Sequence, residues 1–232
     1  MKIKNLVLLL IVIIVLINST ITTSQYIQNK NTVEEEQITV LVTGFGPFSN
    51  FDINPSELIA EELNGTTINN AEIIGLPVTV NLSNFTESIE IVYQAIQDYN
   101  PDYVFSIGLA AGEDKIRIEK IGYNLKTETD SSLERIIPNG RWFRLSPFPV
   151  LRMVRELRKE NIPSYMSLYG GLSLCNGLLY SLLYHIDEND LKIKSGFIHV
   201  PMCKTEEKPD KMELETMVNA TKIIIQVCLD FY

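Results

Sequence analysis

The chain contains few of the residues that bind metal ions. Its 232 residues include three cysteines and two histidines, without a C-x-x-C pair. A structural zinc site needs closely spaced cysteines and histidines, so this class of site is excluded. A dinucleotide-binding loop is also missing, because GLAAG (108–112) is too short to match one. We therefore expect a protein that uses no metal ion and no other cofactor.

Positive charge is scarce as well. Lysine and arginine total 20 against 29 acidic residues, which gives a formal net charge of -9 at pH 7. An acidic chain repels phosphate backbones, and no block of basic residues offsets that repulsion. Nucleic acid is thus excluded as a partner. A homo-oligomer is compatible with the sequence, which does not decide the oligomeric state.

The N-terminus has no apolar run long enough to span a bilayer. Residues 6–17 are aliphatic, after the basic Lys2 and Lys4 and before polar residues, whereas a spanning helix needs roughly 20 apolar residues. This pattern predicts a signal peptide over residues 1–24. The alternative is an uncleaved anchor, because the A-x-A pattern of a cleavage site is missing. Once the leader is cleaved, we expect no stable membrane insertion.

Residues 25–36 are polar, end in three glutamates and are interpreted as a linker. One domain is expected over residues 37–232, a length that allows a full core. Beyond the leader, four N-x-[ST] triplets favour a glycosylated protein that is secreted or stays in the secretory lumen, although an Asn-rich chain also makes such triplets by chance. Their asparagines are Asn64, Asn81, Asn84 and Asn219.

Strand and helix patterns alternate along the domain. Apolar, β-branched runs predict buried strands at 38–45, 71–80, 102–109, 164–169 and 195–201. Helical patterns lie between them and over 212–230. Segment 115–123 is expected to be a half-exposed strand, because apolar and charged residues alternate in it, and 124–146 a long loop. The alternation predicts an α/β protein, a three-layer α/β/α sandwich with a mainly parallel twisted central sheet, whose ligands bind at the carboxyl ends of the strands.

An odd number of cysteines in a secreted chain leaves at least one thiol unpaired. Cys175 follows a glycine break and starts a predicted helix. The partial positive charge and free N–H groups at a helix N-terminus favour a thiolate nucleophile and could bind an oxyanion. Alternatively, Cys175 is a small core residue. Cys203 and Cys228 could pair, but a disulfide requires a short distance that the sequence does not reveal.

His199 ends a predicted buried strand, at the edge of the sheet where sites form. There it could take a proton from Cys175 and return it to a leaving amine, or it could be a satisfied core histidine. Glu119 lies among isoleucines and could hold the imidazole as the third member of a triad, or be a solvated carboxylate. The other histidine, His185, lies on an apolar helix and is interpreted as packing.

Two aromatic residues, Phe45 and Phe48, follow the first strand within TGFGPF. A turn rich in glycine and proline presents them together. They could grip a flat apolar ring, or they could close the core beneath the turn.

Four stretches combine into one family pattern. They are VLVTGFGPF with INPS (40–56), GLAAG with IRIEKIGYN (108–124), GLSLCN (171–176) and SGFIHVP (195–201). In this order and at this spacing they resemble pyroglutamyl-peptidase I, also called pyrrolidone-carboxyl peptidase. The resemblance implies an α/β/α sandwich and a cysteine exopeptidase that removes N-terminal pyroglutamyl residues from peptides without a cofactor.

The resemblance also implies a role for each candidate residue. Cys175 matches the nucleophile of the family, His199 its base and Glu119 the orienting acid. Phe45 and Phe48 match the aromatic residues that hold the pyrrolidone ring. The expected partners are therefore peptides with an N-terminal pyroglutamate.

This chain departs from the family pattern beside these residues. Where the family usually has arginine, after Gly112 and after the catalytic glutamate, the chain has Glu113 and Lys120. A carboxylate near Cys175 would oppose a thiolate, so Glu113 is expected to weaken hydrolysis unless it points into solvent. On this argument Glu113→Arg should raise activity. Two alternatives to an active peptidase follow: a catalytically silent secreted binding protein, and a related cysteine amidase of altered specificity.

Overall fold

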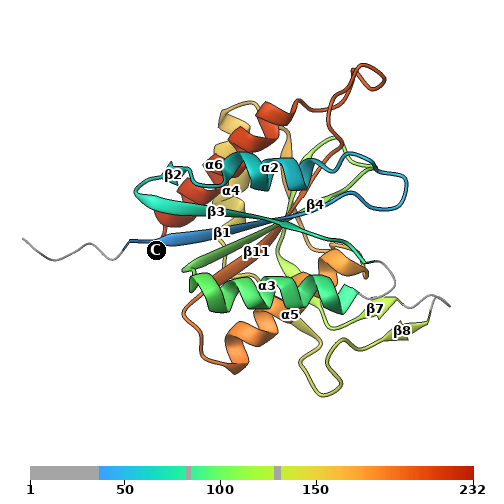
Figure 1. The fold of residues 1–232 in the computed structure, drawn as a ribbon, viewed down its shortest axis with the longest axis vertical. Coiled ribbons are helices and arrows are strands. Elements are labelled where there is room, and N and C mark those ends of the chain that lie inside the picture. The colour runs from blue at the N-terminus through green and yellow to red at the C-terminus, as the bar shows by residue number, and fades with distance from the viewer. Residues whose placement is uncertain (1–36, 82–84, 128–131) are drawn as a thin grey trace, which may run out of the picture. The chain divides into compact units, whose positions relative to one another are not determined.

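A computed structural model of the chain describes residues 37–81, 85–127 and 132–232. The predicted signal peptide and linker over 1–36, and the sequon at Asn84, lie outside these residues. The described part is a seven-stranded sheet with helices on both faces (Figure 1). The predicted α/β/α sandwich is thus confirmed. In this part of the chain, no helix is long and apolar enough to cross a membrane.

The central sheet is mixed but mainly parallel. Its strand order is β10-β5-β11-β4-β1-β3-β2. The strands are β1 (Thr39–Phe45), β2 (Thr67–Ile68), β3 (Ala71–Val78), β4 (Tyr103–Leu109), β5 (Ile116–Glu119), β10 (Ser164–Ser167) and β11 (Lys194–Val200). Neighbours run parallel except for β2 beside β3 and β5 beside β11. Because β5 is antiparallel to β11, the start of β5 lies next to the end of β11.

Helices cover both faces of the sheet. On one face lie α3 (Phe85–Tyr99) and α5 (Leu174–Glu188), and on the other α2 (Pro55–Leu63), α4 (Val150–Lys159) and α6 (Leu214–Leu229) (Figure 1). Successive strand residues point to opposite faces, so each face has its own apolar core. Leu41 and Phe197 belong to the core under α3 and α5, whereas Val40 and Ile198 belong to the other.

The helix after the first strand begins and ends where its sequence predicts. The Asn54 side chain accepts a hydrogen bond from the Ser56 amide at 3.1 Å and caps α2. Its amide group also donates to the Gly46 carbonyl at 2.9 Å. Gly65, with φ of 72°, follows the last turn in the left-handed region that favours glycine. The cap therefore also fixes the turn after β1, which carries Phe48.

The interpretation of residues 115–146 needs correction. Instead of one half-exposed strand over 115–123, β5 belongs to the central sheet, and β6 (Ile121–Tyr123) pairs with β9 (Phe143–Leu145) outside it. The expected loop over 124–146 also contains β7 (Lys126–Thr127) and β8 (Leu133–Glu134), which pair with each other. The alternating pattern is misleading because β10 and β11 flank β5, so its charged side chains meet other parts of the protein.

Candidate active site

Cys175 is the second residue of α5. The helix follows Gly170 and Gly171, and the φ of 85° at Gly171 lies in the region that favours glycine. The Cys175 thiol is half-buried and packs against the apolar core that contains Phe197. The N-cap residue, Ser173, makes no side-chain capping bond. Its hydroxyl therefore does not occupy the N–H groups of the first turn, which are the groups that could bind an oxyanion.

A glycine of β4 makes room for this thiol. A Cβ atom at Gly108 would lie 3.1 Å from Cys175 Sγ and 2.9 Å from Phe197 Cζ. Both distances are shorter than ordinary van der Waals contact, so a side chain there would displace Cys175 or the phenyl ring. Gly108 is also the register partner of His199 in the next strand. The glycine that begins GLAAG therefore lets the nucleophile candidate approach the sheet.

His199 and Glu119 form a buried hydrogen-bonded pair. His199 Nδ1 lies 2.8 Å from Glu119 Oε1, and both side chains are almost fully buried. Burial acts to lower the pKa of His199, but the charge and hydrogen bond of Cys175, followed by those of Glu119, outweigh it and raise that pKa to about 9. The raised pKa favours the protonated imidazole beside Cys175. The structure thus brings the three predicted residues together.

The Glu119 carboxylate is ionised despite its burial. Burial acts to raise its pKa, but the hydrogen bond and charge of His199, then Ser167 and Arg117, outweigh it and hold that pKa below its usual value. The Ser167 hydroxyl makes its hydrogen bonds with the Tyr169 backbone, both at 3.2 Å. Its effect on Glu119 is therefore that of a nearby dipole. Glu119 Oε2 has no hydrogen-bond partner among the described residues.

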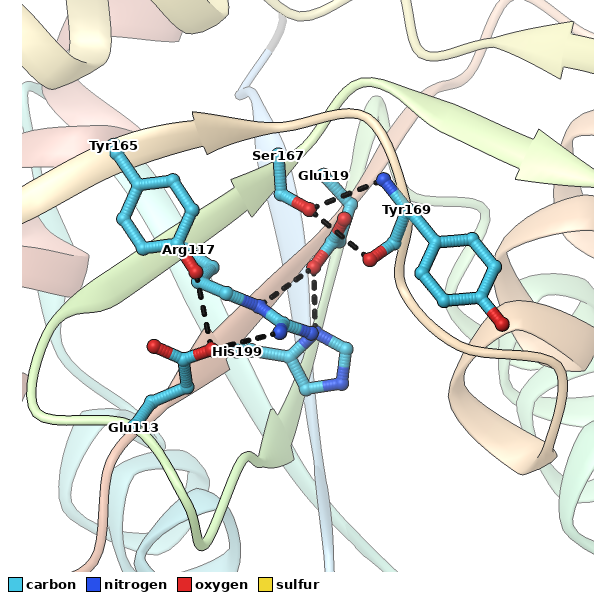
Figure 2. Close-up of polar contacts among 7 residues, drawn as sticks. All are labelled: Glu113, Arg117, Glu119, Tyr165, Ser167, Tyr169 and His199. Atoms are coloured by element: carbon cyan, nitrogen blue, oxygen red, sulfur yellow. Dashed lines mark hydrogen bonds and ion pairs between the residues drawn. The ribbon is translucent and has the colours of Figure 1, made fainter.

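Arg117 is a residue of this site that the sequence analysis did not name. Its Nε lies 3.2 Å from Glu119 Oε1, its Nη1 3.1 Å from Glu113 Oε1, and its Nη2 3.2 Å from His199 Nδ1. Figure 2 shows the guanidinium between the Glu113 carboxylate and the His199 ring. The sequence feature that could have identified Arg117 is its i, i+2 spacing from Glu119. This spacing places both side chains on the same face of a strand.

The environment of Glu113 corrects the expectation that its charge opposes a thiolate. Its carboxylate is only partly exposed to solvent, and its charge is paired. It pairs with Arg117 and accepts a hydrogen bond from the Tyr165 hydroxyl at 3.1 Å (Figure 2). An adjacent guanidinium neutralises most of the field of a carboxylate. The premise behind an activating Glu113→Arg substitution is therefore removed.

The residues that follow Glu119 and Cys175 tie their segments together. Lys120 donates to the carbonyls of Ser146 and Phe148, and burial lowers its pKa. Asn176 accepts from the Tyr123 amide at 2.8 Å and donates to the Tyr123 carbonyl at 2.9 Å. No local sequence pattern indicates this role of Asn176. It holds β6 against the first turn of α5.

The two aromatic residues of the first turn occupy different environments. Phe45 is 4% exposed, and its ring centroid lies 6.3 Å from that of Phe197. It closes the core against which Cys175 packs, as one of the two alternatives for it predicted. Phe48 is half-buried, 5.3 Å from the Phe51 ring. Phe48 is thus the more accessible of the two, and ring binding stays a prediction for both.

The remaining candidates lie away from this set. All three cysteines are free, so Cys203 and Cys228 do not form a disulfide. His185 stacks on the Tyr93 ring at 4.5 Å, which confirms its packing role. Among residues 37–81, 85–127 and 132–232, no group of three or more His, Cys, Asp or Glu side chains could hold a metal ion.

Known proteins are similar to this chain in sequence and in fold. The profile of the pyroglutamyl peptidase family matches residues 38–230. The chain is 36% identical over 201 residues to the pyrrolidone-carboxylate peptidase of Brachyspira hyodysenteriae, covering 82% of this chain and 98% of that protein. It is 33% identical over 208 residues to the one from Pyrococcus furiosus, covering 82% and 98%.

Solved structures of such peptidases have a similar fold. A mutant pyrrolidone carboxyl peptidase from P. furiosus superposes with a TM-score of 0.76 at 31% identity, over 84% of this chain and 99% of that one. Pyroglutamyl peptidase I from Bacillus amyloliquefaciens gives 0.76 at 28% identity, over 83% and 97%. On the family profile, the identity and the coverage, this chain belongs to the pyroglutamyl peptidase family.

Proposed function

We propose that the chain hydrolyses the amide bond after an N-terminal pyroglutamyl residue, with Cys175, His199 and Glu119 as its catalytic residues. One observation carries the assignment of residues. A buried imidazole, held by a carboxylate at 2.8 Å, faces a half-buried thiol at a helix N-terminus. Nucleophile, base and orienting acid of a triad have this relation. The activity itself follows from membership of the family.

The reaction begins with the Cys175 thiolate, which attacks the carbonyl carbon of the pyroglutamyl residue. The N–H groups of the first turn of α5 hold the resulting oxyanion. His199 gives its Nε2 proton to the leaving amine, the C–N bond breaks, and a thioester remains. His199 then takes a proton from water, whose oxygen attacks the thioester, and pyroglutamate leaves as Cys175 is regenerated. Throughout, Glu119 holds Nδ1 and stabilises the imidazolium.

The test is release of a fluorophore from a pyroglutamyl-amide substrate. We expect Cys175→Ala and His199→Gln each to lower the rate by about 1,000-fold or more, because the residues of a triad act as a unit. Cys203→Ala and His185→Gln are the matched controls and should keep the wild-type rate. A prolyl amide with the same leaving group should not be cleaved. Activity that survives Cys175→Ala would refute the assignment of the nucleophile.

The two alternative hypotheses are less well supported. A silent binding protein was motivated by Glu113, whose charge is compensated by Arg117. An amidase of altered specificity predicts faster release from a non-cyclic amide than from the pyroglutamyl amide. A non-cyclic aminoacyl amide with the same leaving group, added to the assay, therefore distinguishes it from the proposed peptidase.

We further propose that the chain enters the secretory pathway. The basic head and short aliphatic run of residues 2–17 support this. Asn64 and Asn219 are exposed, as glycosylation acceptors must be.

A further inference from the structure

We propose that the Glu113–Arg117 ion pair, braced by Tyr165, positions Glu119 and sets the charge that His199 experiences. The proposal rests on the proposed function, because it assigns Arg117 and Glu113 as positioning residues of that same catalytic set. Neither side chain is proposed to touch the reacting atoms. Each acts through the imidazole or through the carboxylate that holds it.

Three neighbouring strands assemble this group. In the register of β11, β5 and β10, Arg117 lies opposite both His199 and Tyr165. From the loop before β5, Glu113 reaches the guanidinium at 3.1 Å and the Tyr165 hydroxyl at 3.1 Å. Figure 2 shows that Tyr165 and Arg117 approach the same carboxylate oxygen. The carboxylate is thereby held against the guanidinium on the side away from Glu119.

The geometry gives Arg117 a role in both protonation states of His199. With a proton on Nδ1, the ring donates to Glu119 Oε1 at 2.8 Å. That proton stays on Nδ1 while Nε2 loses and regains its own, and Arg117 Nη2 lies 3.2 Å from Nδ1 in both states. The fork of the guanidinium reaches Glu119 at the same time. Arg117 thus keeps Glu119 aligned while the proton balance of the imidazole changes.

The charge of Glu113 is needed because Arg117 and the imidazolium are like charges. An uncompensated cation 3.2 Å from Nδ1 would disfavour protonated His199. Pairing with Glu113 makes the two-residue unit nearly neutral. The titratable and charged groups that face His199 are Cys175 from α5, Glu119 and Arg117 from β5, Glu113 from the preceding loop and Tyr165 from β10.

Removing Glu113 and removing Arg117 should therefore shift the titration midpoint of His199 in opposite directions. Glu113→Gln removes one of the two carboxylates that pair with Arg117, so the positive charge beside Nδ1 is less compensated and the midpoint of His199 titration should fall by about one pH unit. Arg117→Gln leaves two carboxylates uncompensated, so the midpoint should rise by about the same amount. The double variant should lie between the two. A purely structural role would not produce shifts of opposite sign.

Imidazole NMR titration of the purified protein measures these midpoints without any substrate. The chain has two histidines, and His185→Gln assigns their signals. His185, which stacks on Tyr93 away from the site, provides the internal reference signal. Asp190→Asn removes a carboxylate from an exposed ion pair with Lys192, before the start of β11, and should move neither signal.

Arg117→Lys separates positioning from charge. Lysine keeps the positive charge but cannot present a planar fork to Glu113, Glu119 and His199 together. We expect a wild-type His199 midpoint, a several-fold lower kcat and an unchanged KM. This variant and Glu113→Gln also decide the question if Arg117→Gln does not fold.

The proposal would be overturned if wild type, Glu113→Gln and Arg117→Gln had equal His199 midpoints. It would also be overturned if both single variants shifted in the same direction. A wild-type kcat for Arg117→Lys would refute the positioning role. Failure of the proposed function has a different signature, namely activity that survives Cys175→Ala, and it leaves the NMR midpoints interpretable.

Discussion

The three thiols of the chain lie in different environments. Cys175 is half-buried at a helix N-terminus and next to His199. Burial and then the charge of Glu213 raise the pKa of Cys203, and burial raises that of Cys228, which is fully covered. Since the thiolate is the reactive form, accessibility and local charge decide the order of reaction.

Brief treatment with iodoacetamide at neutral pH should therefore label Cys175 first, Cys203 slowly and Cys228 not at all. Mass mapping of peptides measures the order. As a control, the three thiols should label at similar rates in guanidinium chloride. Labelling of Cys228 before Cys175 in the folded protein would contradict the environments described here.

The Glu119 carboxyl makes the stability of the fold depend on pH. Its pKa in the folded protein is lower than the usual 4.5 of an unfolded chain. Its contribution to the free energy of unfolding is thus present above pH 4.5 and is lost as the pH falls through the folded pKa. Each pKa unit of difference between the folded and unfolded chain contributes about 1.4 kcal/mol to the free energy of unfolding.

Urea unfolding between pH 7 and pH 3 tests this. Wild type should lose more stability over the range than Glu119→Gln, which cannot titrate at this position. Glu206→Gln removes an exposed carboxyl and should retain the wild-type pH dependence. If the free energy of unfolding depends equally on pH in wild type and Glu119→Gln, protonation of Glu119 is not coupled to folding.

At the scale of elements, β4 and α5 approach closely because Gly108 has no side chain. Gly108→Ala would place a methyl group 3.1 Å from Cys175 Sγ. We expect overpacking to cost about 1–3 kcal/mol. A shift of the sulfur on the order of 1 Å would lower the rate by up to about 100-fold.

The rate of pyroglutamyl-amide hydrolysis and the melting temperature of Gly108→Ala measure both effects. The other glycine of the same GLAAG motif supplies a matched control, because a Cβ atom at Gly112 meets nothing within 4 Å. Gly112→Ala should therefore leave the rate unchanged. Equal rates for the two variants would mean that the close approach at Gly108 has no role in placing Cys175.

At the scale of the whole molecule, the family match begins at residue 38. The preceding residues thus lie outside the matched region, and we propose that they are a secretory leader. Protein from its native host should lose apparent mass on treatment with a glycosidase that removes N-linked glycans.

Asn219 is the better acceptor to mutate. The Asn64 side chain accepts a hydrogen bond from the Gly75 amide at 3.0 Å, so its replacement would disturb the end of α2. Asn219→Gln should reduce the mass lost on glycosidase treatment. Cytosolic protein that retains Met1 would contradict the proposed localisation.

Much of the fold and three of the site residues could be predicted from local patterns. Apolar runs of strand length, the Asn54 cap and the glycine after α2 are decided within a few residues of chain, and they recur in the structure. Cys175, His199 and Glu119 were identified because each lies within a motif that is continuous in sequence. Arg117 lies in the same motif as Glu119, but its contact with His199 joins two strands that are distant in sequence and therefore was not predicted.

The sequence by itself determined the order of the helices, the main strands outside residues 115–146 and the identity of the triad candidates, because short-range propensity and motif spacing encode them. Only the tertiary structure decided what Arg117 and Glu113 do. Their contacts depend on the placement of β5 between β10, to which it runs parallel, and β11, to which it runs antiparallel. A register shifted by one residue would turn the charged side chains of β5 to the opposite face. That register is set by contacts between distant segments. The charges around His199 can therefore be read only from the folded structure.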